Sequence, residues 1–154
     1  MSMELGGNAP FIVFDDADIE AAVEGAIISK YRNNGQTCVC ANRIYVQTGV
    51  YKEFATKLQM AVGKLKMGDG FDPNTTLGPL IGLDAVKKVN SHIEDAISKG
   101  AESIYCGTGE KIDGNFINPT ILTGVKKNMR VATEETFGPL APLFEFSTVQ
   151  EVIE

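Results

Sequence analysis

Apolar and polar positions follow two kinds of pattern along this chain, and each predicts one kind of secondary structure. In some stretches apolar side chains recur at intervals of three and four, as Ile19, Val23 and Ala26 do, which places them on one face of a helix. The acidic run 15–18 supplies N-terminal caps for this helix. Gly100 is suited to end another helix at its C-terminus. The pattern predicts three long helices: from Ile19 towards Tyr31, over 51–66 and over 84–99.

Other stretches are short and apolar, which is typical of strands buried on both faces of a sheet. Residues 68–82 are rich in Gly, Asp, Pro, Asn and Thr and predict a loop. Near the end of the sequence, Thr148 and Glu151 form a capping box, so a further helix begins there. The apolar stretches predict five extended segments: 9–14, 43–47, 102–106, 115–123 around Pro119, and 140–146.

Strands that alternate with long amphipathic helices favour βαβ units. The predicted fold class is therefore α/β, with a mostly parallel sheet flanked by helices. A length of 154 residues fits one domain. A helix that begins at Thr148 has only seven residues in which to form and dock, which is too few to offset the cost of nucleation. We therefore expect the sequence to be part of a larger domain.

Composition and charge narrow the classes of function. The chain is 44% hydrophobic and 22% charged, as ordinary globular domains are. Its net charge of −6 argues against nucleic acid and anionic membranes as partners, because both attract basic patches. No apolar run approaches the ~18 residues of a membrane span, and the N-terminus lacks the pattern of a signal peptide. Three cysteines, an odd number, do not suggest a secreted disulfide framework, so a cytoplasmic location is expected.

The candidate chemistry is concentrated in one polar, glycine-containing stretch, residues 33–43, between a predicted helix and a predicted strand. Cys38 lies within it and has two interpretations. It is either a small buried hydrophobic residue, the commonest environment of a free cysteine, or a nucleophile. A nucleophilic thiolate needs accessible surroundings with backbone N–H groups that stabilise an oxyanion, and a small polar loop provides them.

Three motifs in this sequence resemble those of the aldehyde dehydrogenase superfamily. Residues 35–38 (Gly-Gln-Thr-Cys), followed by 41–43 (Ala-Asn-Arg), resemble its catalytic cysteine loop. Residues 3–10 (Met-Glu-Leu-Gly-Gly-Asn-Ala-Pro) resemble its general-base motif, with Glu4 34 positions before Cys38, and residues 134–139 resemble its cofactor-contacting motif. The form of the cysteine loop is most similar to that of succinate-semialdehyde dehydrogenases.

This resemblance implies a role for each matched residue. Cys38 attacks the aldehyde carbon, hydride leaves to NAD or NADP, and Glu4 activates the water that hydrolyses the resulting thioester. Glu135, Phe137 and Leu5 contact the cofactor. The resemblance also implies that residues 4–154 are a partial catalytic domain without the dinucleotide-binding domain, and that the complete enzyme is a homo-oligomer. We therefore expect the isolated chain to be inactive.

Two neighbours of Cys38 have both a structural and a functional interpretation. Arg32, at the end of the first predicted helix, is either a surface residue that suits the helix dipole or, by resemblance, the group that binds a carboxylate on the substrate. Cys40 is either a passive neighbour or a redox partner that forms a strained, reducible disulfide with Cys38. Cys106, on a predicted strand, is most simply a core residue.

Some alternatives stay open on the sequence alone. Glu4 is also consistent with a solvated residue near the terminus, and the pair formed by Glu134 and Glu135 with a solvated charge pair. The substrate of the complete enzyme is either succinate semialdehyde or another aldehyde, and a non-catalytic module that self-associates is the remaining class. His92 is the only histidine, so a metal site is not expected.

Overall fold

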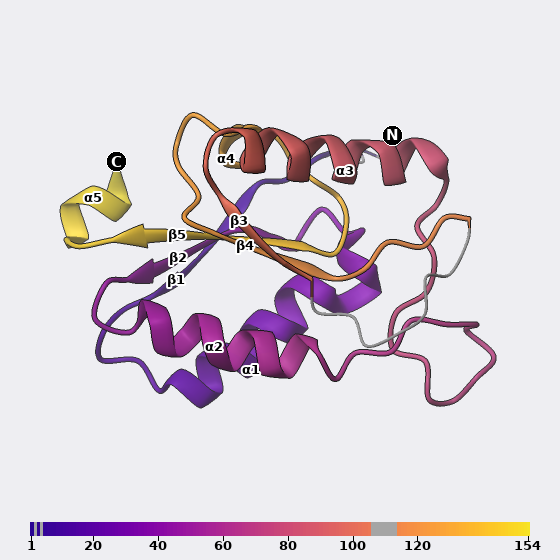
Figure 1. The fold of residues 1–154 in the computed structure, drawn as a ribbon, viewed down its shortest axis with the longest axis horizontal. Helices are drawn as coiled ribbons and strands as arrows, with labels where there is room; N and C mark the ends of the chain where they lie inside the picture. Colours follow the sequence, from indigo (N-terminus) through magenta and orange to yellow (C-terminus); the bar gives the residue numbers. More distant parts are fainter. Residues whose placement is uncertain (2, 4, 106–113) are drawn as a thin grey trace.

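The structure is a computed structural model that describes residues 1, 3, 5–105 and 114–154. Its elements form a single sheet with helices on both sides (Figure 1). The elements are, in chain order, β1 (Ala9–Val13), α1 (Ile19–Tyr31), the 3-10 turn η1 (Arg32–Gly35), β2 (Ala41–Gln47), α2 (Tyr51–Val62), α3 (Leu83–Ser98), β3 (Glu102–Tyr105), β4 (Thr120–Thr123), α4 (Arg130–Thr133), β5 (Leu140–Phe146) and α5 (Val149–Ile153).

The five strands lie in the order β1-β2-β5-β4-β3. Strands β1, β2, β5 and β4 are parallel to one another, and only β3 runs antiparallel to its neighbour β4. This arrangement confirms the predicted α/β class with a mostly parallel sheet. The central strand β5 is buried at every position except Glu145, as expected for a strand covered on both faces.

Two hydrophobic layers separate the helices from the sheet. Helices α1 and α2 cover one face, with Phe54 and Leu58 of α2 packed against Ile44 of β2 in the first layer. Helices α3 and α4 cover the opposite face, where Val89 and Leu140 belong to the second layer. Figure 1 shows this sandwich edge-on, with α1 and α2 on one side and α3 and α4 on the other.

The helix and strand boundaries agree with the sequence pattern except at a few points. The helix predicted over 51–66 ends at Val62, because the chain then closes two tighter turns, from Lys64 N–H to Ala61 O and from Leu65 N–H to Val62 O. Leu65 nevertheless packs against the core, as its place in the apolar stripe predicts. Helix α4 was not predicted, because four residues are too few to show a helical period.

The ends of the long helices bear out the predicted capping residues. The Asp18 side chain accepts a hydrogen bond from the Ala21 N–H at the start of α1. Gly100 follows α3 with φ 95°, the left-handed conformation that ends helices. Thr148 caps α5 by accepting from the Glu151 N–H, as the capping box predicts, but Glu151 accepts from the N–H of Ser147, one residue before the N-cap. Among the residues described, no helix is both long and apolar enough to cross a membrane.

The parallel strands bring three distant segments to one edge of the sheet. Residues 5–8 precede β1, residues 33–40 precede β2 and residues 134–138 precede β5. Because β1, β2 and β5 are adjacent and parallel, their N-terminal ends lie side by side. The motifs identified in the sequence therefore meet at the amino ends of the strands.

Candidate active site

A shallow hollow at this edge is lined by all three of those segments. Leu5 and Gly6 come from the first segment, Phe137 from the third, and the cysteine loop, defined here as residues 33–40, provides the rest. Cys38 is exposed in it. The structure thus brings together three residues that the sequence singled out, namely Leu5, Cys38 and Phe137. The residues of the cysteine loop that line the hollow are Gln36, Thr37 and Cys38.

The cysteine loop leaves α1 through an unusual run of backbone conformations. Asn33, Asn34 and Gly35 have φ values of 51°, 58° and 74°, in the left-handed region that glycine and asparagine tolerate better than other residues. The Asn33 amide donates to the Gln36 carbonyl at 3.0 Å, and the Asn34 amide donates to the Gly78 carbonyl at 2.8 Å. The residue types of the loop therefore match its backbone, and the turn presents Cys38 outwards.

Glycines allow the three segments to approach one another closely. A Cβ on Gly7 would overlap the carbonyl oxygen of Cys38, and a Cβ on Gly35 would overlap the carbonyl oxygen of Gly138. Gly7 packs directly on the backbone of the cysteine, and Gly35 packs on the end of the loop that carries Phe137. Residues with side chains at these positions would separate the walls of the hollow.

Glu135 connects the third segment, residues 134–138, to the first, residues 5–8, through a hydrogen bond. Its Oε1 accepts a hydrogen bond from the Gly7 N–H at 3.1 Å. No described residue donates a hydrogen bond to its other oxygen, Oε2, which lies beside Gly6. The adjacent Phe137 has φ 57°, a conformation that costs a bulky residue free energy unless its surroundings enforce it.

Glu134 is held in an ionic network, although 44% of its side chain is still exposed. Arg130 donates to both of its oxygens, at 3.0 and 2.8 Å, and its Oε2 lies 3.2 Å from His92 Nε2. The hydrogen bonds from Arg130 lower the pKa of Glu134 to about 2. Burial lowers the pKa of His92, so its ring is neutral at pH 7.

Lys30 is a functional candidate that the sequence interpretation missed. It is fully buried on α1 beneath the cysteine loop, and its Nζ donates to Asn42 Oδ1 at 3.3 Å. Burial lowers the pKa of Lys30 to about 8, although the nearby Cys40 and Glu135 oppose this effect. A signal was present in the sequence, because Lys30 falls four residues after Ala26 and seven after Val23, on the same apolar face of the helix.

The two cysteines of the loop have opposite environments. Cys38 is exposed, whereas Cys40 is 1% exposed. Cys40 Sγ lies 2.8 Å from Thr37 Oγ1 and 3.9 Å from the Arg32 carbonyl oxygen. Both cysteines are free thiols in this structure.

The remaining predicted residues differ in what the structure says of them. Arg32 lies at the first position of η1 with an exposed side chain, and no described residue forms an ion pair or hydrogen bond with its guanidinium. Glu4 and Cys106 lie outside the described residues, so their predicted roles stay predictions. Across the described part of the chain, no cluster of three or more His, Cys, Asp or Glu side chains is arranged to hold a metal ion.

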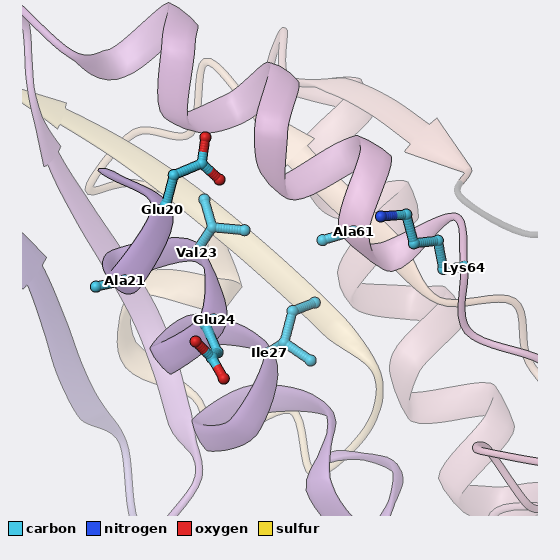
Figure 2. A pocket seen from close by; sticks show the side chains of 7 residues that line it. All are labelled: Glu20, Ala21, Val23, Glu24, Ile27, Ala61 and Lys64. Carbon is cyan, nitrogen blue, oxygen red and sulfur yellow. The ribbon is translucent and has the colours of Figure 1, made fainter. Parts of the chain in front are cut away.

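A second hollow lies away from these loops, between α1 and the C-terminal end of α2. Figure 2 shows Val23 and Ile27 at its floor, with the carboxylates of Glu20 and Glu24 on α1 and the Lys64 ammonium on the other side. None of the residues singled out for chemistry lines it. Its side chains belong to the packing of two helices, and the cysteine hollow is the better candidate for a reaction site.

Comparison with known proteins relates this chain to aldehyde dehydrogenases. The sequence model of the aldehyde dehydrogenase family matches residues 1–154. The chain is 67% identical over 153 residues to a glutarate-semialdehyde dehydrogenase of Pseudomonas putida, covering 99% of this chain and 32% of that protein. It is 60% identical over 154 residues to a 3-sulfolactaldehyde dehydrogenase of Pseudomonas putida, covering 100% and 32% respectively.

Comparison with solved structures gives the same family. The crystal structure of a succinate-semialdehyde dehydrogenase from Burkholderia pseudomallei superposes with a TM-score of 0.94 at 62% identity, covering 99% of this chain and 32% of that one. The chain therefore spans about a third of the length of the relatives that it matches.

Proposed function

We propose that this chain, which belongs to the aldehyde dehydrogenase family, carries the thiol chemistry of an enzyme that oxidises an aldehyde to its carboxylic acid with NAD or NADP. The observation that supports this most directly is that an exposed Cys38 shares one hollow with Leu5 and Phe137. Three segments distant in sequence converge on a single thiol, and the convergence depends on close glycine contacts.

In this proposal Cys38 is the nucleophile. Its thiolate attacks the aldehyde carbon to form a thiohemiacetal, which loses hydride and becomes a thioester. The Cys38 N–H makes no hydrogen bond to a described residue, so it is free to donate to the oxyanion formed at the attacked carbon. Cys38→Ala should abolish aldehyde oxidation by the complete enzyme.

We assign the general base to Glu4, which would deprotonate the water that hydrolyses the thioester. The support for this role is its motif and its place in the sequence next to Leu5, which lines the hollow. Glu4→Gln should let the first turnover proceed and block the second, because acylation needs only the thiolate. A pre-steady-state burst of one NAD(P)H per active site would support the assignment, and normal turnover would exclude it.

The residues around the hollow fit a dinucleotide. Glu135 uses one carboxylate oxygen for the Gly7 N–H, and its second oxygen remains available for a ribose hydroxyl. Phe137 and Leu5 provide apolar surface beside Cys38. NAD or NADP supplies the hydride acceptor when it is bound. Glu135→Gln should raise the KM for the dinucleotide more than the KM for the aldehyde.

We further propose that the substrate carries an anionic group at the end opposite its aldehyde. Arg32 supports this, because its exposed guanidinium precedes Cys38 by six residues and has no ion-pair partner among the described residues. The relatives named for glutarate semialdehyde, succinate semialdehyde and 3-sulfolactaldehyde agree, since each of these aldehydes also bears a carboxylate or a sulfonate. A guanidinium pairs with either anion through two hydrogen bonds.

The test compares charged and uncharged aldehydes of matched length in the complete enzyme. Arg32→Gln should lower kcat/KM for succinate semialdehyde at least about 100-fold, on the order of the ~3 kcal/mol of a lost charge-assisted pair, and leave butanal within about two-fold. Arg32→Lys is the matched control, because it keeps the positive charge but cannot form the paired hydrogen bonds of a guanidinium. Equal losses on both aldehydes would exclude the anion-binding role and favour an enzyme for a neutral aldehyde.

A non-catalytic, self-associating module is the second candidate. The observation in its favour is exposed apolar surface on and beside an edge strand, with Ile12 of β1 41% exposed and Ile28 of α1 60% exposed. We expect the complete enzyme to form homo-oligomers and the 154-residue chain to form no NAD(P)H from succinate semialdehyde. Turnover by the purified chain would refute the second expectation, and a monomer in size-exclusion chromatography would exclude the self-associating module.

Cys40 is proposed as the redox partner of Cys38. A peroxide would oxidise the Cys38 thiolate to a sulfenic acid, and the Cys40 thiolate would then attack its sulfur and expel hydroxide, which closes the disulfide. Because Cys40 is buried against Thr37, closure should be slow. Dithiothreitol should restore a peroxide-treated enzyme, and Cys40→Ser should make the inactivation irreversible. Inactivation of the unmodified enzyme that dithiothreitol fails to reverse would exclude the switch.

A further inference from the structure

Helix α3 contacts the 134–138 loop through a buried polar side chain. His92 is completely buried, and both of its ring nitrogens face this loop. Nδ1 lies 3.0 Å from Thr136 Oγ1, and Nε2 lies 3.2 Å from Glu134 Oε2. Since Thr136 is itself buried, its contact with His92 is shielded from water, whereas the Glu134 side chain is 44% exposed.

The hydrogen-bond directions follow from the charges. Glu134 is ionised, because Arg130 lowers its pKa to about 2, and an ionised carboxylate only accepts hydrogen bonds. The proton of the neutral His92 ring must therefore be on Nε2. Nδ1 then accepts from the Thr136 hydroxyl. One tautomer satisfies both partners, so the ring is fixed in a single orientation.

The same helix also contacts Arg130, which binds Glu134, at two points and the loop itself at one more. Arg130 donates from Nη1 to Ser91 Oγ and from its backbone N–H to Asp95 Oδ2. A Cβ on Gly138 would overlap the Val89 side chain. Helix α3, or a group bound to it, thus contacts every second residue of the loop, namely 134, 136 and 138. The two residues between them, Glu135 and Phe137, point to the other segments of the site.

This alternation explains how Phe137 keeps its left-handed backbone. Such a conformation is unfavourable for a non-glycine residue and persists only where neighbours enforce it. Thr136 on one side and Gly138 on the other are both fixed against α3. An apolar residue in place of His92 would fill the core without burying a polar group, so packing alone does not account for a histidine here.

We propose that His92 is a positioning residue that holds Glu135 and Phe137 at the hollow through Thr136 and Glu134. The proposal rests on the function proposed above, in which those two residues contact the dinucleotide. His92 itself touches neither cofactor nor substrate. Its role is to transmit the rigidity of a 16-residue helix to the loop that forms one wall of the site.

Three substitutions in the complete enzyme separate the two hydrogen bonds. His92→Phe removes both, His92→Gln can keep the bond to Glu134, and His92→Asn can keep the bond to Thr136. We expect His92→Phe to raise the KM for the dinucleotide about ten-fold, the equivalent of ~1.4 kcal/mol, and to leave the KM for the aldehyde within about two-fold. His92→Asn should restore most of this loss, because Thr136 directly precedes Phe137.

Thr136→Val supplies an independent check on the same path. If His92 acts through the Thr136 hydroxyl, this isosteric change should reproduce the dinucleotide KM of His92→Phe, and the double variant should be no worse than either single variant. Additive losses would place the two residues on separate paths and would overturn the proposal.

Ile93→Val is the matched control, since it removes a methyl from the neighbouring buried position of α3 and so weakens the core without changing a hydrogen bond. It should lower thermal stability without changing the dinucleotide KM. Hydrogen exchange of the amides of residues 134–138 gives a readout that needs no cofactor. Exchange should accelerate at least about ten-fold in His92→Phe, which corresponds to ~1.4 kcal/mol of local protection, and stay near the unmodified rate in Ile93→Val.

The outcomes distinguish this proposal from the proposed function. If the unmodified enzyme reduces neither NAD nor NADP with any aldehyde, the proposed function fails, and the exchange rates still decide whether His92 holds the loop. If the amides of residues 134–138 exchange at the same rate in His92→Phe and Ile93→Val, His92 is an ordinary core residue and the proposal is wrong. The same conclusion follows if the two variants change the dinucleotide KM equally.

Discussion

The two loops that meet at the hollow both contain left-handed backbone, but they are held by different kinds of contact. The cysteine loop depends on neutral amides: Asn33 and Asn34 donate to backbone carbonyls, and Gln36 accepts from the Ile81 N–H. The 134–138 loop depends on charge, through the contacts of Glu134 with Arg130 and His92.

The difference matters for how the two walls respond to solution conditions. Neutral hydrogen bonds change little with pH and salt, whereas ionic networks at a partly exposed site respond to both. The nucleophile therefore lies on the wall whose geometry is less sensitive to its medium. The proposed cofactor contacts lie on the wall that a change in charge can loosen.

The contact between the two loops should be the most sensitive point in the site. Gly35 has φ 74°, and a Cβ there would overlap the Gly138 carbonyl oxygen. Gly35→Ala adds a left-handed alanine, at about 1 kcal/mol, to a steric clash of about 1–3 kcal/mol. We expect a loss of about 2–4 kcal/mol in the free energy of unfolding, measured by urea denaturation, because both walls must shift.

Gly100→Ala separates these two contributions. Gly100 has φ 95°, and no atom lies within 4 Å of the position its Cβ would take, so only the backbone cost of about 1 kcal/mol should appear. Equal losses at the two positions would mean that the loops are not in the tight contact described here.

Lys30 lies between the two walls, near Cys40 and Glu135, and its removal should stabilise the protein. Lowering a lysine pKa from 10.5 to about 8 corresponds to about 3 kcal/mol of unfavourable free energy for the charged form at pH 7. Lys30→Met keeps the length of the side chain and removes the charge, at the cost of the hydrogen bond to Asn42, about 1 kcal/mol. We expect a net gain of about 1–2 kcal/mol in urea denaturation at pH 7.

The stability gained by Lys30→Met should decrease as pH rises. The folded pKa of Lys30 lies below the unfolded value, so the penalty is fully present below the folded pKa and is relieved as pH rises from about 8 towards 10.5. The advantage of Lys30→Met should disappear over that range. Lys52→Met, at an exposed lysine of α2, is the control and should show no such change. A Lys30→Met variant less stable than the unmodified protein at pH 7 would show that the ammonium is better paired than its single hydrogen bond indicates.

Much of the fold and part of the site could be predicted from the sequence. Periodicity located α1 to its end residues, and the parallel class of the sheet followed from the alternation of strands and helices. Because each motif precedes a strand, the parallel arrangement brings Leu5, Cys38 and Phe137 to one hollow. These features depend on local residue types or on general rules of topology, and sequence patterns carry both.

The supports of the site could not be predicted in the same way. His92 lies 42 residues before Glu134, and nothing local to either residue indicates that they meet. Helix α4, which supplies Arg130, is a single turn and has no period to detect. Lys30 was detectable in principle from its place on an apolar helix face, but its proximity to Cys40 and Glu135 depends on three-dimensional packing.

The smallest expected effect concerns the charged wall alone. The folded pKa of Glu134, about 2, lies below its ordinary value of 4.5, chiefly because Arg130 donates to it. Its contribution to stability is therefore fully present above pH 4.5 and is lost as pH falls from 4.5 towards 2. Glu134→Gln, which cannot titrate, should make the free energy of unfolding less dependent on pH over this interval, as measured by urea denaturation at successive pH values.

Asp95, whose pKa is also lowered by the Arg130 N–H and by Lys99, remains in the variant, so the slope of the free energy of unfolding against pH should decrease and not vanish. In 1 M salt the two proteins should converge, since the network is partly exposed and screened. An unchanged slope would show that the 134–138 loop is as insensitive to charge as the cysteine loop, and the contrast between the two walls would not hold.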